Sequence, residues 1–262
     1  MGSTGERVHL DEREYLTAIE VARRQVSSDY AFIVGAGQQS VRGTIAEISK
    51  AARVGADTVL VITPSFYRPA MTQEVLFSYY QAVADDSPIP VLLYSMPALT
   101  GIKLEPQTIA RLSDHPNIIG VKDSSNDVAG FTATVERCPP EFAVMTGNGT
   151  VLFDMLEAGA TGGILAVGCV VPEACLEIFK LFRNGAVEQA RTLQSQLTPL
   201  ATAVTTKFGI GGLKVAMDLN GYVGGFVRSP LQSPGDEAKG EIGALLREQI
   251  PSVARRSLPL MP

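Results

Sequence analysis

Short apolar runs alternate with helix-like segments along this 262-residue chain, and this alternation constrains the fold more than any other feature. The runs that predict strands span residues 32–35, 58–63, 90–94, 118–122, 142–146 and 163–167. Helical patterns cover residues 11–27, 41–54, 72–85, 105–113, 127–136 and 149–158. Strands that alternate with helices indicate βα units and a parallel sheet. Because several runs are apolar throughout, we expect helices to cover the sheet.

The strand pattern stops at about residue 172. The segments beyond it have helical patterns, at residues 173–183, 187–206, 211–219 and 235–248. A helical carboxy-terminal subdomain is therefore expected to follow the βα units.

Composition excludes several classes of function. The net charge of −5 is unfavourable for binding nucleic acid or an anionic membrane. The three cysteines, which include no Cys-x-x-Cys pair, do not suggest a disulfide framework or a zinc site. No apolar run has membrane-spanning length, and no signal-peptide pattern is present. We therefore expect a cytoplasmic protein. The alternative is an organellar protein whose targeting segment lies upstream of Met1.

Two residues at the carboxyl ends of predicted strands are candidates for a catalytic site. Lys122 ends the apolar run 117–121, and Tyr94 has the same place on the preceding predicted strand. A lysine held at a buried strand end is either deprotonated and nucleophilic, or it reaches solvent or pairs with a carboxylate such as Asp123. The carboxyl ends of parallel strands form the sites of α/β proteins. A lysine and a phenol at such an edge suit imine chemistry.

The first residues offer a third polar element. The sequence Gly2-Ser3-Thr4-Gly5 combines small residues, whose backbone amides are accessible, with two hydroxyls, and this composition is typical of an anion cradle. The alternative is a flexible start whose hydroxyls cap the following helix.

Three segments resemble the signatures of the dihydrodipicolinate synthase/N-acetylneuraminate lyase family, and they occur in the family's order: 2–6 (GSTGE), 94–101 (YSMPALTG) and 120–124 (GVKDS). Within that family, residues 86–95 and 208–225 look closest to 4-hydroxy-2-oxoglutarate aldolase. The resemblance implies a (β/α)8 barrel and a class I aldolase that forms a Schiff base with pyruvate or another 2-oxo acid. It also implies a homo-oligomer, a dimer or tetramer, with no cofactor other than the covalent imine and no metal.

The resemblance assigns roles to individual residues. Lys122 is expected to form the imine, and Tyr94 to transfer protons together with Ser3. Thr4 and Gly5 are expected to hold the substrate carboxylate with Ser3, and the backbone carbonyl of Ile164 to contact pyruvate.

A tyrosine from a neighbouring subunit completes the proton relay in the family. Its place falls within residues 63–69 (TPSFYRP). Alignment to the synthase branch puts Phe66 there, whereas the aldolase branch favours Tyr67, which we take as the candidate.

The chain departs from the family in two ways. Leu99 occupies the place where the synthase branch has an arginine for the aldehyde's carboxylate, which disfavours dihydrodipicolinate synthesis. A strand, a helix and a second strand that precede the first motif in the family have no counterpart here. We therefore expect an amino-terminally truncated barrel with six strands and two open edges, in which residues 1–184 contain the site and residues 185–262 form the helical subdomain.

The predicted reaction is cleavage, or formation, of 4-hydroxy-2-oxoglutarate or a 2-oxo-3-deoxy sugar acid, with pyruvate as the common product or substrate. The alternatives are a 4-hydroxy-tetrahydrodipicolinate synthase or dehydratase of the same family, and a truncated, inactive member.

Overall fold

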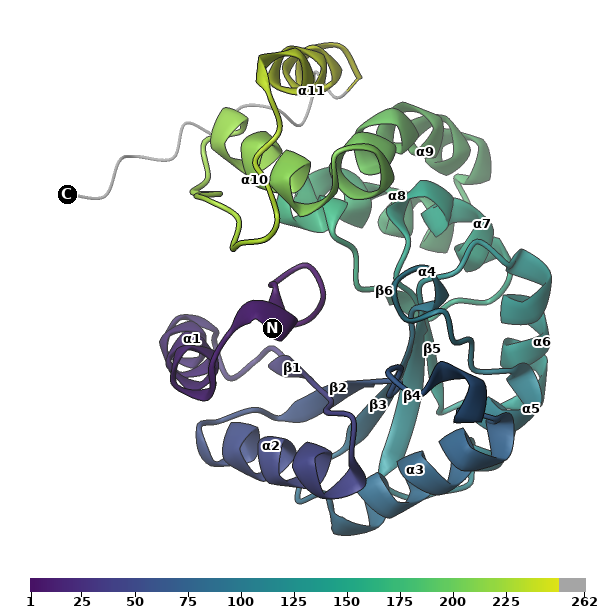
Figure 1. Ribbon diagram of the computed structural model, residues 1–262. Coiled ribbons are helices and arrows are strands. Elements are labelled where there is room, and N and C mark those ends of the chain that lie inside the picture. The colour runs from purple at the N-terminus through teal and green to yellow at the C-terminus, as the bar shows by residue number, and fades with distance from the viewer. Residues whose placement is uncertain (250–262) are drawn as a thin grey trace. The chain divides into compact units, whose positions relative to one another are not determined.

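The computed structural model describes residues 1–249, and its sheet contains six strands in the order in which they occur along the chain (Figure 1). They are β1 (Ile33–Ala36), β2 (Thr58–Ile62), β3 (Val91–Ser95), β4 (Ile118–Asp123), β5 (Ala143–Thr146) and β6 (Gly162–Gly163). The pairs β1–β2, β2–β3 and β3–β4 are parallel. The six predicted strands and the α/β class are thus confirmed. β6 is shorter than predicted, because the backbone is already helical at Ala166 and enters the short helix η4 (Val167–Cys169).

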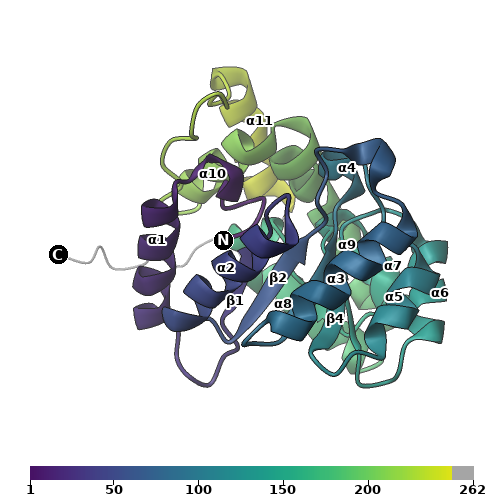
Figure 2. The same cartoon turned by 60° about the horizontal axis from the view of Figure 1, so that its bottom comes forward.

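The described chain forms two compact units, which we treat separately. The first comprises Met1–Met145 and Ala158–Thr161, and the second comprises Thr146–Glu157 and the chain from Gly162 onward. Helical segments of the first unit are η1 (Arg7–His9), α1 (Glu12–Gln25), α2 (Val41–Arg53), η2 (Arg68–Ala70), α3 (Gln73–Asp86), α4 (Pro97–Thr100), α5 (Pro106–Ser113) and α6 (Val128–Arg137). Figures 1 and 2 show α2, α3, α5 and α6 side by side along one face of the strands.

Side-chain caps set the starts of several of these helices. Asp11 and Glu14 form a reciprocal capping box at the start of α1. Ser40 accepts a hydrogen bond from the Gly43 amide at the start of α2, and Thr72 caps α3 in the same way. Such caps satisfy backbone amides that the first helical turn leaves without a partner. The predicted helix positions are therefore confirmed to within one or two residues.

Alternation along the strands gives the sheet two different faces. On β3, Leu92 and Tyr94 pack with Leu60 of β2 in one apolar cluster. Val91 and Leu93, one residue out of phase, point to the opposite face and are fully buried. Lys122 is the register partner of Tyr94, so both side chains lie on the same face of the sheet.

The second unit is mainly helical. Besides β6 and η4 it contains η3 (Gly149–Val151), α7 (Leu152–Glu157), α8 (Pro172–Arg183), α9 (Val187–Thr202), the π-helical turn η5 (Ala203–Lys207), α10 (Gly209–Leu219) and α11 (Asp236–Gln249). Buried Gln194 joins α9 to η3 and α7, because its side chain accepts from the Phe153 amide and donates to the Gly149 carbonyl. None of the helices within residues 1–249 combines the length and apolar character needed to cross a membrane.

Candidate active site

Lys122 and Tyr94 are paired residues on adjacent strands. They are register partners in the β3–β4 ladder, and the Lys122 Nζ atom lies 4.3 Å from the centre of the Tyr94 ring. Lys122 is 8% exposed and Tyr94 is 4% exposed. No carboxylate within residues 1–249 forms an ion pair with Lys122. Of the interpretations that the sequence left open, solvent exposure and an ion pair with Asp123 are therefore both wrong.

Asp123 does not pair with Lys122, because successive side chains on a strand point to opposite faces. Its carboxylate accepts a hydrogen bond from the Ser125 amide (2.7 Å), and it is 5% exposed. Burial raises the pKa of the Asp123 carboxyl above its usual range, against the opposing effect of the Ser125 hydrogen bonds. Asp123 thus shapes the turn behind the lysine.

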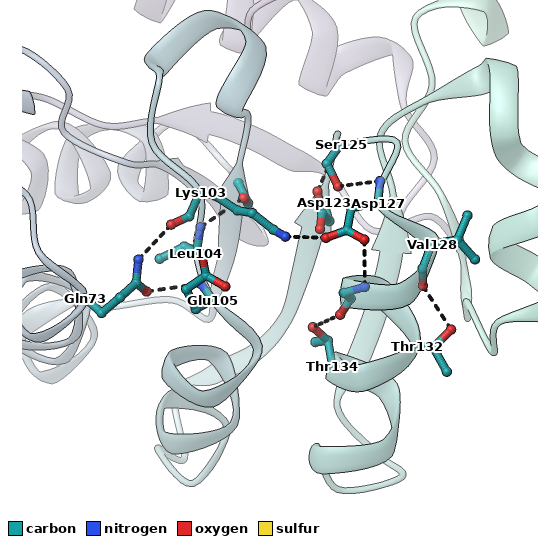
Figure 3. A network of polar contacts seen from close by, with 12 residues as sticks. Gln73, Lys103, Leu104, Glu105, Asp123, Ser125, Asp127, Val128, Thr132 and Thr134 are labelled. Carbon is teal, nitrogen blue, oxygen red and sulfur yellow. Dashed lines mark hydrogen bonds and ion pairs between the residues drawn. The ribbon is translucent and has the colours of Figure 1, made fainter.

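Around Asp123, polar contacts tie together the loops that follow β2, β3 and β4 (Figure 3). Lys103 forms an ion pair with Asp127 at 2.5 Å, and Asp127 also caps α6 through the Gly130 amide. The side chain of Gln73 donates to the Lys103 carbonyl (2.9 Å) and accepts from the Glu105 amide (3.0 Å).

A second tie is made by Ser95 at the end of β3. Its carbonyl accepts from the Ser124 amide, and its hydroxyl accepts from the Leu104 amide. The strand ends that hold Tyr94 and Lys122 are therefore linked on the side away from the two side chains. Sequence reasoning missed these supporting residues; the Asp-x-x-Gly spacing at residue 127 is a recognisable helix cap, but nothing local identifies Lys103 as its partner.

The amino-terminal segment lies beside Tyr94. Ser3 Oγ and Tyr94 Oη are 3.4 Å apart. The Gly5 amide donates to the Gly2 carbonyl (3.1 Å), so it is used within the turn. In the described part of the chain, the amides of Ser3 and Thr4 have no protein acceptor, which leaves them for a ligand.

Gly35 on β1 allows this segment to approach the sheet. A Cβ atom at Gly35 would lie 1.7 Å from the Met1 carbonyl oxygen, so no side chain fits there. The Tyr15 hydroxyl donates to the Gly35 carbonyl (3.0 Å), and the Arg7 guanidinium lies over the Tyr15 ring and pairs with Glu47. Burial raises the pKa of Tyr15 to about 12. These contacts hold Met1 and Arg7, which flank Ser3 in the sequence, close to β1.

The remaining predicted residues belong to other segments of the chain. Tyr67 and Phe66 are 70% and 77% exposed, and their rings are in edge-to-face contact. Within residues 1–249, neither ring makes a hydrogen bond or ring contact with Tyr94. Ile164 belongs to the second unit, where its amide donates to the Thr146 carbonyl (2.9 Å).

The assembled groups can perform carbonyl chemistry. A buried primary amine without an ion-pair partner is a nucleophile for a ketone carbon, and the two adjacent hydroxyls can pass protons to and from the reacting atoms. Free backbone amides at Ser3 and Thr4 suit a carboxylate. The geometry therefore fits a 2-oxo acid that is held as an imine.

Comparisons with known proteins point to one family. The model of the dihydrodipicolinate synthetase family matches residues 1–249. The 4-hydroxy-tetrahydrodipicolinate synthase of Cellvibrio japonicus is 34% identical over 232 residues, which cover 88% of this chain and 79% of that protein.

Solved structures give the same result. A prophage protein of the dihydrodipicolinic acid synthase family from E. coli K12, crystallised with pyruvate, superposes with a TM-score of 0.87 at 30% identity, covering 95% of this chain and 85% of that one. Dihydrodipicolinate synthase from Thermotoga maritima superposes with a TM-score of 0.89 at 28% identity, with the same coverage of both chains.

Proposed function

Since the chain belongs to the dihydrodipicolinate synthetase family, a family of lyases, we propose that it cleaves a 4-hydroxy-2-oxo acid to pyruvate and an aldehyde through an imine on Lys122. The observation that carries this proposal is the buried Lys122 amine at 4.3 Å from the Tyr94 ring centre, without a carboxylate partner in the described chain.

The proposed reaction begins with attack of the Lys122 amine on the ketone carbon at C2. Tyr94 donates its proton to the departing hydroxyl, so that loss of water gives a protonated imine, which withdraws electrons from C3, and leaves a phenolate. The Tyr94 phenolate oxygen then takes the proton of the 4-hydroxyl and the C3–C4 bond breaks, so that an aldehyde leaves and an enamine remains on Lys122. Protonation at C3 and hydrolysis release pyruvate. Because the imine is the electron sink, this reaction requires neither a metal nor an organic cofactor.

Ser3 and Thr4 supply the remaining contacts to the 2-oxo acid. The Ser3 hydroxyl, 3.4 Å from the Tyr94 hydroxyl, passes protons to it. The free amides of Ser3 and Thr4 hold the C1 carboxylate, and the Ile164 carbonyl is the predicted further contact to pyruvate. Gly5 acts through the conformation of the turn, since its amide is bonded to Gly2.

We also propose that the chain acts as a homo-oligomer, a dimer or tetramer, in which Tyr67 of one subunit completes the proton relay of another. Its support is the exposure of the Phe66–Tyr67 pair. Mixing inactive Lys122→Met subunits with inactive Tyr67→Phe subunits tests this arrangement. Recovery of part of the activity is expected, because some mixed sites contain both native residues, and no recovery would contradict it.

The preferred substrate is 4-hydroxy-2-oxoglutarate or a 2-oxo-3-deoxy sugar acid. Leu99 is apolar and 64% exposed on α4, so that position offers no charge to a substrate. The second candidate, a 4-hydroxy-tetrahydrodipicolinate synthase, is favoured by the names of the curated relatives.

One assay separates the two reactions. Pyruvate release from 4-hydroxy-2-oxoglutarate is measured beside condensation of pyruvate with aspartate semialdehyde. The proposal predicts a higher kcat/KM for cleavage, and efficient condensation with negligible cleavage would establish the synthase instead.

A further inference from the structure

The loop after β2 places an arginine against the loop after β3. Arg68 begins η2, and its side chain lies on Gly101, where a Cβ atom would be 2.8 Å from Arg68 Cδ and 2.9 Å from Nη1. Gly101 ends α4 in the left-handed conformation, with φ 68°. Residue 101 is therefore glycine for two reasons, its backbone angle and the space that Arg68 occupies.

The loop that holds Arg68 is itself anchored. The Gln39 side-chain oxygen accepts hydrogen bonds from both the Ser65 and Phe66 amides, each at 2.9 Å. Upstream of this loop, Ile62 at the end of β2 is the register partner of Tyr94. Arg68 is itself exposed, and its side chain lies against Gly101 in the loop after β3, at the edge of the sheet where β2, β3 and β4 end.

Arg68 has no carboxylate partner within residues 1–249. The loops that follow β1 to β4 contain only one other cation, Lys103, and Asp127 already binds it. Arg7, near the amino-terminal segment, pairs with Glu47. Arg68 is consequently the cation of these loops that is free for an anion, and its planar fork suits a carboxylate.

A 4-hydroxy-2-oxo diacid presents a second carboxylate at C4, beyond the reach of the amides that hold its first. We propose that Arg68 is a specificity-determining residue that binds this distal carboxylate and makes the enzyme selective for diacids. This inference rests on the proposed function and adds the substrate class to it.

The test compares two substrates that differ only in the distal group: 4-hydroxy-2-oxoglutarate and 4-hydroxy-2-oxopentanoate, which has a methyl group in place of the carboxylate. Arg68→Met should lower kcat/KM for the diacid by about 10- to 100-fold, the range for a lost charge-assisted hydrogen bond. The same variant should keep kcat/KM for the monoacid within about twofold of wild type. Arg68→Lys should recover part of the activity on the diacid. Arg13→Met, which removes an exposed arginine of α1, is the control and should change neither substrate.

Borohydride trapping of pyruvate distinguishes a failure of the proposed function, imine formation on Lys122, from a failure of the inference about Arg68. Suppose that the wild-type protein forms the pyruvate adduct, but Arg68→Met lowers kcat/KM equally for both substrates or for neither. Arg68 then does not recognise the distal carboxylate. A wild-type enzyme that traps pyruvate yet prefers the monoacid overturns the inference as well. Failure of the wild-type protein to form any adduct overturns the proposed function, and this inference with it.

Discussion

Tyr94 and Lys122 face each other across the β3–β4 ladder, with the lysine amine 4.3 Å from the centre of the phenol ring. The parallel register places them on the same face of the sheet, and neither side chain is more than 8% exposed. In the proposed reaction, the lysine therefore meets a substrate carbonyl beside a proton carrier and away from bulk water.

Replacing Tyr94 with phenylalanine should abolish most turnover without unfolding the protein. The ring and its packing with Leu60 and Leu92 remain, whereas the hydroxyl next to Ser3 is lost. General acid–base groups contribute about 10²–10⁴-fold to rate, so kcat should fall by that factor. Steady-state kinetics and circular dichroism measure the two effects. A kcat within about threefold of wild type would remove Tyr94 from the mechanism.

Gly35→Ala should displace the amino-terminal segment. The new methyl group would overlap the Met1 carbonyl, and such overpacking costs about 1–3 kcal/mol. Because the Ser3 hydroxyl would move away from Tyr94 and the Ser3 amide away from the proposed C1 carboxylate, activity should fall by about tenfold or more, the effect expected when a hydrogen bond to a charged group is lost. Gly240→Ala is the control, since it faces open space in α11. Unchanged kinetics in Gly35→Ala would show that Ser3 is not positioned by β1.

Alkaline pH should destabilise the fold through two buried tyrosines. Burial raises the pKa of both Tyr15 and Tyr79 to about 12, from an ordinary value of 10.0. Since the folded-state pKa is the higher one, their contribution is complete below pH 10 and is lost as the pH rises toward 12. At pH 11 the contribution of each tyrosine to the free energy of unfolding should be about 1 kcal/mol smaller than below pH 10.

Urea unfolding at pH 9 and pH 11 measures this loss. The double variant Tyr15→Phe/Tyr79→Phe should have lower stability at pH 9, where it lacks the hydrogen bonds of both hydroxyls, but a flatter dependence of stability on pH between the two values. The same slope in the variant and the wild type would mean that other groups govern alkaline unfolding.

The Lys103–Asp127 ion pair should stabilise the fold at neutral pH, and acid should remove this stabilisation. The hydrogen bond from Lys103, followed by that from the Gly130 amide, lowers the pKa of Asp127 below 3.8. The resulting stabilisation is present above that value and disappears as the pH falls through the lower, folded-state pKa. Asp127→Asn keeps the helix cap without the charge, whereas Asp127→Ala also loses the cap, worth about 1 kcal/mol.

Denaturation at pH 7 should therefore rank wild type above Asp127→Asn, and Asp127→Ala last. The difference between wild type and Asp127→Asn should shrink as the pH falls below 4. A difference that stays constant with pH would show that charge pairing with Lys103 does not stabilise these loops.

Local patterns account for most of what could be predicted. Uninterrupted apolar runs bounded by cap residues located every strand and the main helices, and the strand ends identified Tyr94 and Lys122. The four-residue helix α4 is too short to leave a periodic signal. The Lys103–Asp127 and Arg7–Glu47 pairs join residues distant in sequence, so no local pattern reveals them. That Asp123 faces away from Lys122 follows from strand alternation, which the sequence does show.

The proposed mechanism depends most directly on Lys122 as the residue that forms the imine. Wild-type protein and the variant Lys122→Arg are incubated with pyruvate and sodium borohydride, and the adduct is mapped by peptide mass spectrometry. We predict one reduced pyruvate adduct, on Lys122, and none in Lys122→Arg, because arginine stays protonated and cannot form the imine. An adduct on another lysine, with Lys122→Arg still active, would contradict the central claim.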